Sequence, residues 1–367
     1  MKFIRENILK ILLVVGVLII IIVILIACSS SGSTGRATSY SKMEDNLKNA
    51  ATRYLKSHSE LLPTEEGRIE QVQMDSIYTK KQMDKMTAID DSSVKCDGYV
   101  NVSYRLNEND EKVYRVVPHV KCADKYETED LYIHILKNEE LVTELDGLYK
   151  IGNEYIFRGE NPNNYLQIGE RLYRIMSIDE NGYIKIVTNK KPYVNGVWDD
   201  RYNVNTGKED GINNYNVSRI RESLKEYYDD KDSYSSLEKD VFIKHSICIG
   251  KRSENNKEIN KTEECSMTLD EDYLSLPILY DYFITSVDKN CKDIYSESCK
   301  NYNYMAPLTI MPTLTASKDR TNMVFEIGDT AMLTKASRNR KAAIVTYITN
   351  VTYTSGKGTL ESPYMIK

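Results

Sequence analysis

The feature that constrains this chain most is an apolar run close to its N-terminus. Residues 11–27 read ILLVVGVLIIIIVILIA and contain no charged side chain. A helix that crosses a membrane needs about 20 apolar residues. The run reaches that length when it is extended back over Ile8 and Leu9, with the aliphatic stem of Lys10 buried and its amine at the headgroups. The sequence therefore predicts a membrane-spanning helix here.

The charges that precede the run predict its orientation. Lys2, Arg5 and Lys10 all lie on its N-terminal side, and positively charged flanks favour the cytoplasmic face of a membrane. We therefore expect residues 1–28 to be a single anchor in the cell membrane and residues 29–367 to be extracellular.

The end of the run allows a second interpretation. The sequence LIAC, ending at Cys28, resembles a bacterial lipobox, in which the cysteine is lipidated and becomes the mature N-terminus. The run is longer than the 7–15 apolar residues usual for a signal sequence, and both interpretations stay open. Residues 29–42 are rich in serine and glycine and predict a flexible tether. Either way, the membrane is the first expected partner.

The overall composition bears on other partners. The net charge is −5 and no basic block is present, so nucleic acid is not an expected partner. The chain has 28 tyrosines against 5 phenylalanines and 1 tryptophan. A tyrosine-rich surface suits recognition of a glycan or a protein, although an AT-rich genome would produce the same enrichment.

Six cysteines remain after Cys28, and they predict disulfides. None forms a Cys-x-x-Cys pair, so zinc-ribbon and thioredoxin chemistry are not indicated. An even number in an exported region is typical of a disulfide framework. About fifteen pairings are possible, and closeness in the chain favours three local ones. These are Cys96 with Cys122, Cys248 with Cys265, and Cys291 with Cys299.

Residues 43–128 predict a small α+β domain. Apolar residues at three- and four-residue steps from Met43 indicate an amphipathic helix that ends before Pro63. A short second helix is expected near 79–86. Alternating apolar residues then predict strands over 98–106 and 112–122.

The remainder predicts a β-rich mixed domain. Residues 129–153 read as a connector and residues 154–367 as short strands, with a hairpin turn at Asn181-Gly182 and a helix after Ser218. The predicted fold class is α+β. It comprises an N-terminal anchor helix, a small helix-plus-antiparallel-sheet domain and a β-rich domain stapled by disulfides.

No motif for a reaction is present. The fragment SGKGT at 355–359 lacks the glycine that a phosphate loop requires, and the acidic clusters do not match a calcium loop. We therefore predict no catalytic residue, metal or cofactor. Trp198, the single tryptophan, is a candidate for stacking on a sugar, with Tyr202 and Tyr215 as further binding candidates.

Residues 155–367 resemble a domain of unknown function from surface proteins of low-GC Gram-positive bacteria. The resemblance rests on residues 159–188, where Tyr173-Arg174-Ile175 stands for the usual Trp-Arg-Ile strand, and on 212–228 and 350–366. Better-patterned members of that family are similar to C-type-lectin-like and sulfatase-modifying folds. The chain departs from the pattern at 311–317, which replaces a tryptophan-containing segment, and at 341–348, which lacks an Arg-Pro pair. The family has no established activity.

Residues 43–128 resemble the head of a type IV pilin-like protein. The segments CDGYVNV, at 96–102, and HVKCADKYET, at 119–128, are similar to the cysteine strands of such heads, whereas the prepilin cleavage pattern is absent.

Together, the features of the whole sequence predict a membrane-tethered, non-enzymatic surface protein that binds a glycan or a protein. The alternatives are a cell-envelope enzyme and a pilin-like assembly subunit.

Overall fold

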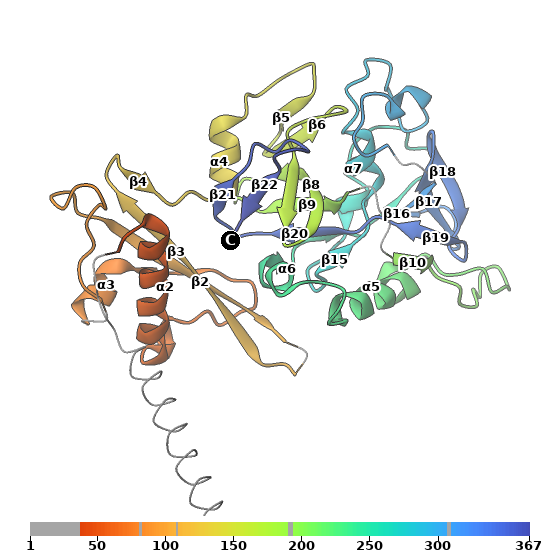
Figure 1. Cartoon of the computed structure of the whole chain (residues 1–367). Helices are drawn as coiled ribbons and strands as arrows, with labels where there is room; N and C mark the ends of the chain where they lie inside the picture. The colour runs from red at the N-terminus through yellow and green to blue at the C-terminus, as the bar shows by residue number, and fades with distance from the viewer. Residues whose placement is uncertain (1–36, 81–82, 108, 190–193, 307–309) are drawn as a thin grey trace, which may run out of the picture.

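A computed structural model describes residues 37–80, 83–107, 109–189, 194–306 and 310–367. The described chain is mixed α+β, with a sheet-rich body and three disulfides. It forms an N-terminal unit, up to residue 128, and a C-terminal unit, from residue 129 onward (Figure 1). The apolar run and Cys28 lie outside the described residues.

The N-terminal unit is a helix packed on an antiparallel sheet. The sheet order is β1-β2-β3-β4, and β2 and β3 are paired from Asp97–Lys121 to Leu106–Lys112. The elements are α2 (Tyr40–Lys56), η1 (Ser59–Leu61), β1 (Glu70–Gln73), α3 (Met74–Thr79), β2 (Asp97–Leu106), β3 (Lys112–Cys122) and β4 (Tyr126–Glu127).

Helix α2 starts earlier than its apolar pattern suggested. The Ser39 hydroxyl accepts a hydrogen bond from the Lys42 amide at 3.1 Å and caps the helix there. Residues 40–42, expected in the tether, are thus helical.

The second helix of this unit, α3, was expected near 79–86 and instead lies at Met74–Thr79, directly after β1. Its buried Met74 and Ile77 face the core. The prediction of a helix near residues 79–86 did not include them.

The C-terminal unit is built around a ten-stranded sheet and a four-stranded sheet. Its helical elements are α4 (Leu131–Asn138), η2 (Tyr215–Val217), α5 (Arg219–Asp229), α6 (Ser236–Val241), η3 (Glu264–Ser266), α7 (Leu279–Phe283) and η4 (Glu297–Lys300). Its strands are β5 (Gly147–Ile151), β6 (Glu154–Arg158), β7 (Tyr165–Ile168), β8 (Arg171–Ile178), β9 (Ile184–Thr188), β10 (Val194–Val197), β11 (Phe242–Ile243), β12 (Ile247–Cys248), β13 (Lys251–Arg252), β14 (Thr268–Leu269), β15 (Leu274–Ser275), β16 (Met311–Ser317), β17 (Met323–Ile327), β18 (Ala331–Lys335), β19 (Asn339–Ala342), β20 (Val345–Ile348), β21 (Tyr353–Ser355) and β22 (Tyr364–Ile366).

The large sheet joins distant parts of the chain. Its main path runs β11-β20-β9-β8-β7-β22-β21, with β15 pairing β20 and β6 linking β5 to β8. The predicted turn between β8 and β9 is present, and Gly182 adopts φ 81°, a conformation that glycine takes without steric cost. The SGKGT fragment lies at the junction of β21 and the loop that leads to β22.

The segment expected as a connector contributes to the C-terminal unit. Leu131 and Ile135 of α4 and Leu148 of β5 are fully buried in its core, and the Leu131 amide donates to the Val351 carbonyl at 3.0 Å. The sequence between 129 and 153 is thus packed against the sheet because its apolar residues recur on one face of α4.

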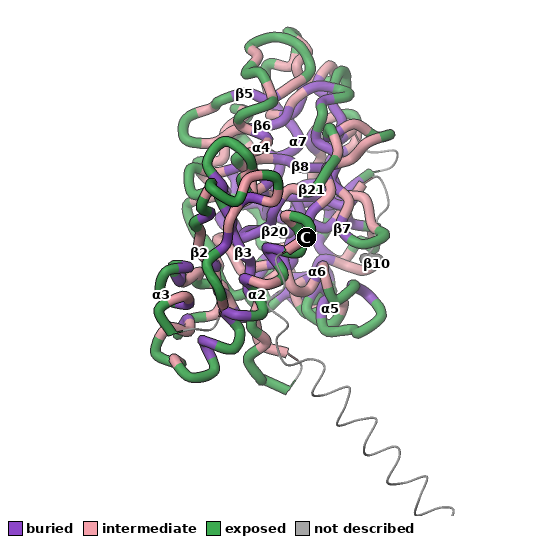
Figure 2. The backbone as a smooth tube through the Cα atoms, turned by 60° about the vertical axis from the view of Figure 1, so that its left-hand side comes forward, coloured by how far each residue is buried: buried purple, intermediate pink, exposed green. Residues whose placement is uncertain are grey.

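Each unit has its own core. Within the described residues, one buried apolar cluster runs from Met43 to Cys122 and the other from Leu131 to Ile366, and they share no member. Figure 2 shows the buried residues following the strands and the exposed residues following the loops. Within the described ranges, none of the helices combines the length and the apolar character that a membrane span requires.

Candidate functional site

The two units meet along a seam, and a groove of about 390 Å³ opens there. The N-terminal unit lines it with Glu66, Asp110 and the end of β2, from Arg105 to Asn107. The C-terminal unit lines it with one face of α5, with Lys239 and Lys244, and with residues 271–274. A volume in the range of about 300–1,000 Å³ is typical of ligand sites, and sites commonly lie between domains.

Glu66 joins the two units at the base of the groove. Its carboxylate accepts hydrogen bonds from Lys244 Nζ at 2.5 Å, from the Leu106 amide at 2.9 Å and from the Tyr273 hydroxyl. Burial alone would raise the pKa of Glu66, but the hydrogen bonds from Lys244, Tyr273 and Leu106 outweigh it, and the pKa lies below its usual value. Glu66 is therefore ionised at neutral pH.

Two tyrosines form an aromatic wall beside this carboxylate. The rings of Tyr228, on α5, and Tyr273 stack with centroids 4.3 Å apart and planes 9° apart. Lys244 Nζ lies 5.1 Å from the Tyr273 ring and Lys239 Nζ lies 5.7 Å from the Tyr228 ring, within the distance of a cation–π contact. Burial raises the pKa of both hydroxyls, so both stay protonated.

Paired charges join α5 to residues 271–272, beside the two tyrosines. Arg221 donates to both oxygens of Asp272, from Nε at 2.7 Å and from Nη2 at 3.0 Å, and Nη2 also reaches Glu271 at 3.0 Å. Lys225 Nζ lies 3.4 Å from Asp272. Asp272 is almost fully buried, whereas Lys225 and Glu271 are exposed and can contact a ligand. The second seam contact, Arg105 Nη2 to Asp240 at 2.9 Å, closes the base nearby.

The groove can bind a ligand through charges of both signs. Its lining includes the exposed charged residues Asp110, Lys225, Asp229 and Glu271. Among the described residues, no group of three or more histidine, cysteine, aspartate or glutamate side chains is placed to hold a metal ion. The arrangement therefore suits polar recognition through hydrogen bonds and ion pairs.

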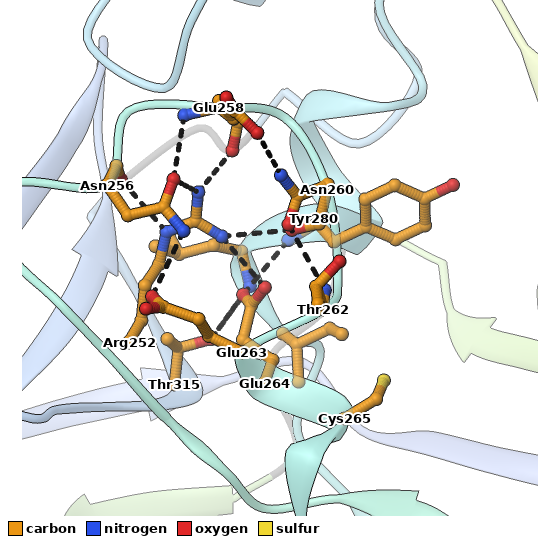
Figure 3. Close-up of polar contacts among 12 residues, drawn as sticks. Arg252, Asn256, Glu258, Asn260, Thr262, Glu263, Glu264, Cys265, Tyr280 and Thr315 are labelled. Carbon is orange, nitrogen blue, oxygen red and sulfur yellow. Dashed lines mark hydrogen bonds and ion pairs between the residues drawn. The ribbon is translucent and has the colours of Figure 1, made fainter.

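A second polar cluster lies away from the groove and organises a loop. Arg252 is fully buried, and its guanidinium donates to Glu264 Oε2 at 2.9 Å, to the Asn260 carbonyl at 3.0 Å and to the carbonyls of Asn256 and Glu258 (Figure 3). Glu264 also accepts from the Thr315 hydroxyl at 3.0 Å. The guanidinium thus fixes residues 253–264 from within, and no sequence pattern had marked this arginine.

The three predicted binding residues do not form one surface. Trp198 is 3% exposed and donates from Nε1 to the Thr313 carbonyl at 3.1 Å, and Tyr215, 4% exposed, lies with its ring centroid 6.3 Å away. Both belong to the core, which contradicts a stacking role for them on a ligand. Tyr202 is 56% exposed, away from both cores. The groove residues had no sequence signal because they come from segments far apart in the chain.

The six cysteines are joined as three local pairs. The structure links Cys96 to Cys122, Cys248 to Cys265 and Cys291 to Cys299, with S–S distances of 1.98, 1.99 and 1.91 Å. The predicted disulfide framework is confirmed, in the pairing that closeness in the chain favoured.

Comparison with known proteins yields no relative. No family model matches the chain, and no curated protein or solved structure matches it either. The resemblances to a surface-protein domain and to a pilin-like head therefore stay predictions.

Proposed function

We propose that this protein is a membrane-tethered extracellular surface protein with a non-enzymatic binding role, and that its groove holds a segment of a partner protein. The observation that carries the proposal is the groove itself, which lies between two separately cored units and is rimmed by charges of both signs. The three disulfides support an oxidising location outside the cytoplasm.

The charged residues of the groove favour a polypeptide over a ligand whose charged groups all have the same sign. Lys225 and Lys239 line the groove together with Asp110, Asp229 and Glu271. A ligand with only negative or only positive groups would meet some lining residues of like charge, which costs binding energy. A peptide with acidic and basic side chains can pair with both. The stacked tyrosines add apolar area beside these charges.

Panning a displayed random-peptide library against the full-length protein in detergent tests this function. We expect enriched peptides to carry charges of both signs and to bind at least tenfold more weakly to a variant with Lys225→Glu and Glu271→Lys. The matched control is Lys289→Glu, because Lys289 is exposed and does not line the groove. Failure to enrich any peptide, or binding that is unaffected by the groove variant, would overturn the proposal.

A pilin-like assembly subunit is the second candidate. It is favoured by the packing of α2 on a four-stranded antiparallel sheet in the N-terminal unit. This function predicts that the protein appears in filaments sheared from cells, which immunogold electron microscopy would test. Its absence from such filaments would exclude the assembly role.

A further inference from the structure

A second cavity, of about 650 Å³, lies in the C-terminal unit and has no wall from the N-terminal unit. Its lining includes Glu160, Asn161, Asp288 and three consecutive residues from Asn301 to Asn303. We propose that this cavity binds a neutral carbohydrate, with the ring of Tyr302 stacked on one face of a pyranose. The proposal goes beyond the groove, because none of its observations involves the seam.

The backbone at Tyr302 is the first observation. Its φ is 46°, in the left-handed region that residues with a Cβ rarely adopt, and the residue is 58% exposed. A bulky residue in this conformation persists only where the surroundings determine it. Glycine or asparagine would fit the turn better, so the turn itself does not explain the presence of tyrosine. Tyr302 lines the cavity, and a role of its ring in binding would explain a tyrosine at this position.

The surroundings of Tyr302 hold it in place. Asn303 is buried and donates from Nδ2 to the carbonyls of Tyr282, at 3.0 Å, and Cys299, at 2.9 Å. Its Oδ1 accepts from the Thr285 hydroxyl at 2.6 Å and from the Met305 amide at 2.9 Å. The Tyr302 carbonyl accepts from the Val287 amide at 3.3 Å. Because these contacts hold the backbone of residues 302 and 303, Tyr302 loses little conformational entropy when a ligand binds.

Covalent and backbone ties complete this support. The Cys291–Cys299 disulfide closes the loop just before Tyr302. The Tyr304 amide donates to the Gly159 carbonyl at 2.7 Å, and the Gly159 amide donates to the Thr285 carbonyl at 2.8 Å. These bonds also fix the position of Glu160 and Asn161, which follow Gly159 in the chain and line the same cavity.

The polar groups of the cavity suit sugar hydroxyls. A hydroxyl both donates and accepts hydrogen bonds, so it pairs with a carboxylate, which accepts, and with an amide, which does both. In the described part of the chain, the side chains of Glu160 and Asn161 have no hydrogen-bond partner and are exposed. Asn301 Nδ2 donates to Asp288 Oδ2 at 2.8 Å, which orients that pair at the rim. An aromatic face beside such groups favours a carbohydrate.

The charges of the cavity select against an acidic sugar. Glu160 and Asp288 place two carboxylates in the lining. Lys300, the cation of the lining, is paired with Asp329 at 2.9 Å, and this hydrogen bond raises the pKa of Lys300. A uronic or sialic acid would therefore meet repulsion that a neutral or N-acetylated pyranose avoids.

The test is binding of the full-length protein, in detergent, to an array of neutral, N-acetylated and acidic oligosaccharides. Three variants are compared with it: Tyr302→Gly, which removes the ring and suits the positive φ; Tyr302→Phe, which keeps the ring; and Tyr114→Ala. The last is a matched control, because Tyr114 is an exposed tyrosine that lies outside the linings of the cavity and the groove. Thermal unfolding is measured on all four proteins.

We expect the wild type, Tyr302→Phe and Tyr114→Ala to retain the same neutral or N-acetylated glycans. Tyr302→Gly should bind them at least tenfold more weakly while its melting temperature stays equal or rises, since the strained backbone is relieved. No bound glycan, binding restricted to acidic glycans, or full binding by Tyr302→Gly would each overturn the proposal. The groove variant with Lys225→Glu and Glu271→Lys should leave glycan binding unchanged, so failure of either proposed site is distinguishable from failure of the other.

Discussion

Glu66 and Lys244 are 178 residues apart in the chain, yet the Glu66 carboxylate accepts a hydrogen bond from Lys244 Nζ at 2.5 Å across the seam. Tyr273 donates to the same carboxylate from the C-terminal unit. The seam also contains Arg105 with Asp240 and Lys367 with Glu44. Because these contacts are charged, salt weakens them more than it weakens the two apolar cores.

Glu66→Gln should loosen the seam. The amide keeps the size of the side chain but removes the charge that Lys244 and Tyr273 use, and we expect a loss of about 1–3 kcal/mol in the free energy of unfolding. Urea unfolding followed by circular dichroism measures this loss. Glu60→Gln is the control, because Glu60 is exposed and outside the groove lining. Equal stability of the two variants would show that the contact does not hold the units together.

The disulfides should differ in their contribution to stability. Cys96 and Cys122 are 26 residues apart, whereas Cys291 and Cys299 are 8 apart. Closing a longer loop removes more entropy from the unfolded chain, so replacing the first pair by serine should cost about 1 kcal/mol more than replacing the second. Denaturant unfolding of the two double variants gives this difference. The reverse order would contradict the loop-entropy account.

Breaking the buried ion pair should be costly. Arg252 and Glu264 are both fully buried. Arg252→Met leaves the Glu264 carboxylate without its cationic partner, and several loop carbonyls lose the hydrogen bonds that the guanidinium donates. We expect a loss of about 3–5 kcal/mol in the free energy of unfolding. Arg320→Met is the control, because Arg320 is exposed in its ion pair with Glu254, and an exposed pair contributes about 0–1 kcal/mol. Similar losses in both variants would argue against a special role for burial.

Two variants at the seam, Asp130→Asn and His119→Gln, should have stabilities that depend on pH in opposite directions. Burial raises the pKa of Asp130 to about 6 and lowers the pKa of His119 to about 4, and the two side chains lie 3.7 Å apart. Between about pH 4 and pH 6 the folded Asp130 binds more protons than the unfolded one, so its contribution to stability falls as pH rises. The folded His119 binds fewer protons than the unfolded one in that window, so its contribution rises.

In the native protein these two effects oppose each other. Asp130→Asn should therefore leave the effect of His119, with stability increasing from pH 4 to pH 6. His119→Gln should leave the effect of Asp130, with stability decreasing over the same window. In each variant the free energy of unfolding should change by about 2–3 kcal/mol between pH 4 and pH 6. Urea unfolding at several pH values measures this change. Parallel pH profiles in the two variants would refute the assignment.

Local features were predictable from the sequence. Apolar spacing located helix α2 and the strands β2 and β3, Ser218 marked the start of α5, and Asn181-Gly182 marked the turn between β8 and β9. The disulfide pairs were also predictable. All of these depend on residues close together in the chain, where periodicity, capping and short loops act directly.

Burial and the candidate sites were decided by tertiary structure. The sequence did not show that Trp198 is buried or that the Arg252 guanidinium donates hydrogen bonds to the loop that follows it. It also did not show that Glu66 accepts a hydrogen bond from Tyr273, which is 207 residues away. Whether an aromatic ring faces solvent depends on what packs over it, and a groove between two units exists only when both have folded. Local sequence patterns account for the individual helices, the turns and the cysteine pairs, because these features depend on residues that are close together in the chain. The surfaces available to a ligand came from the packing of distant segments.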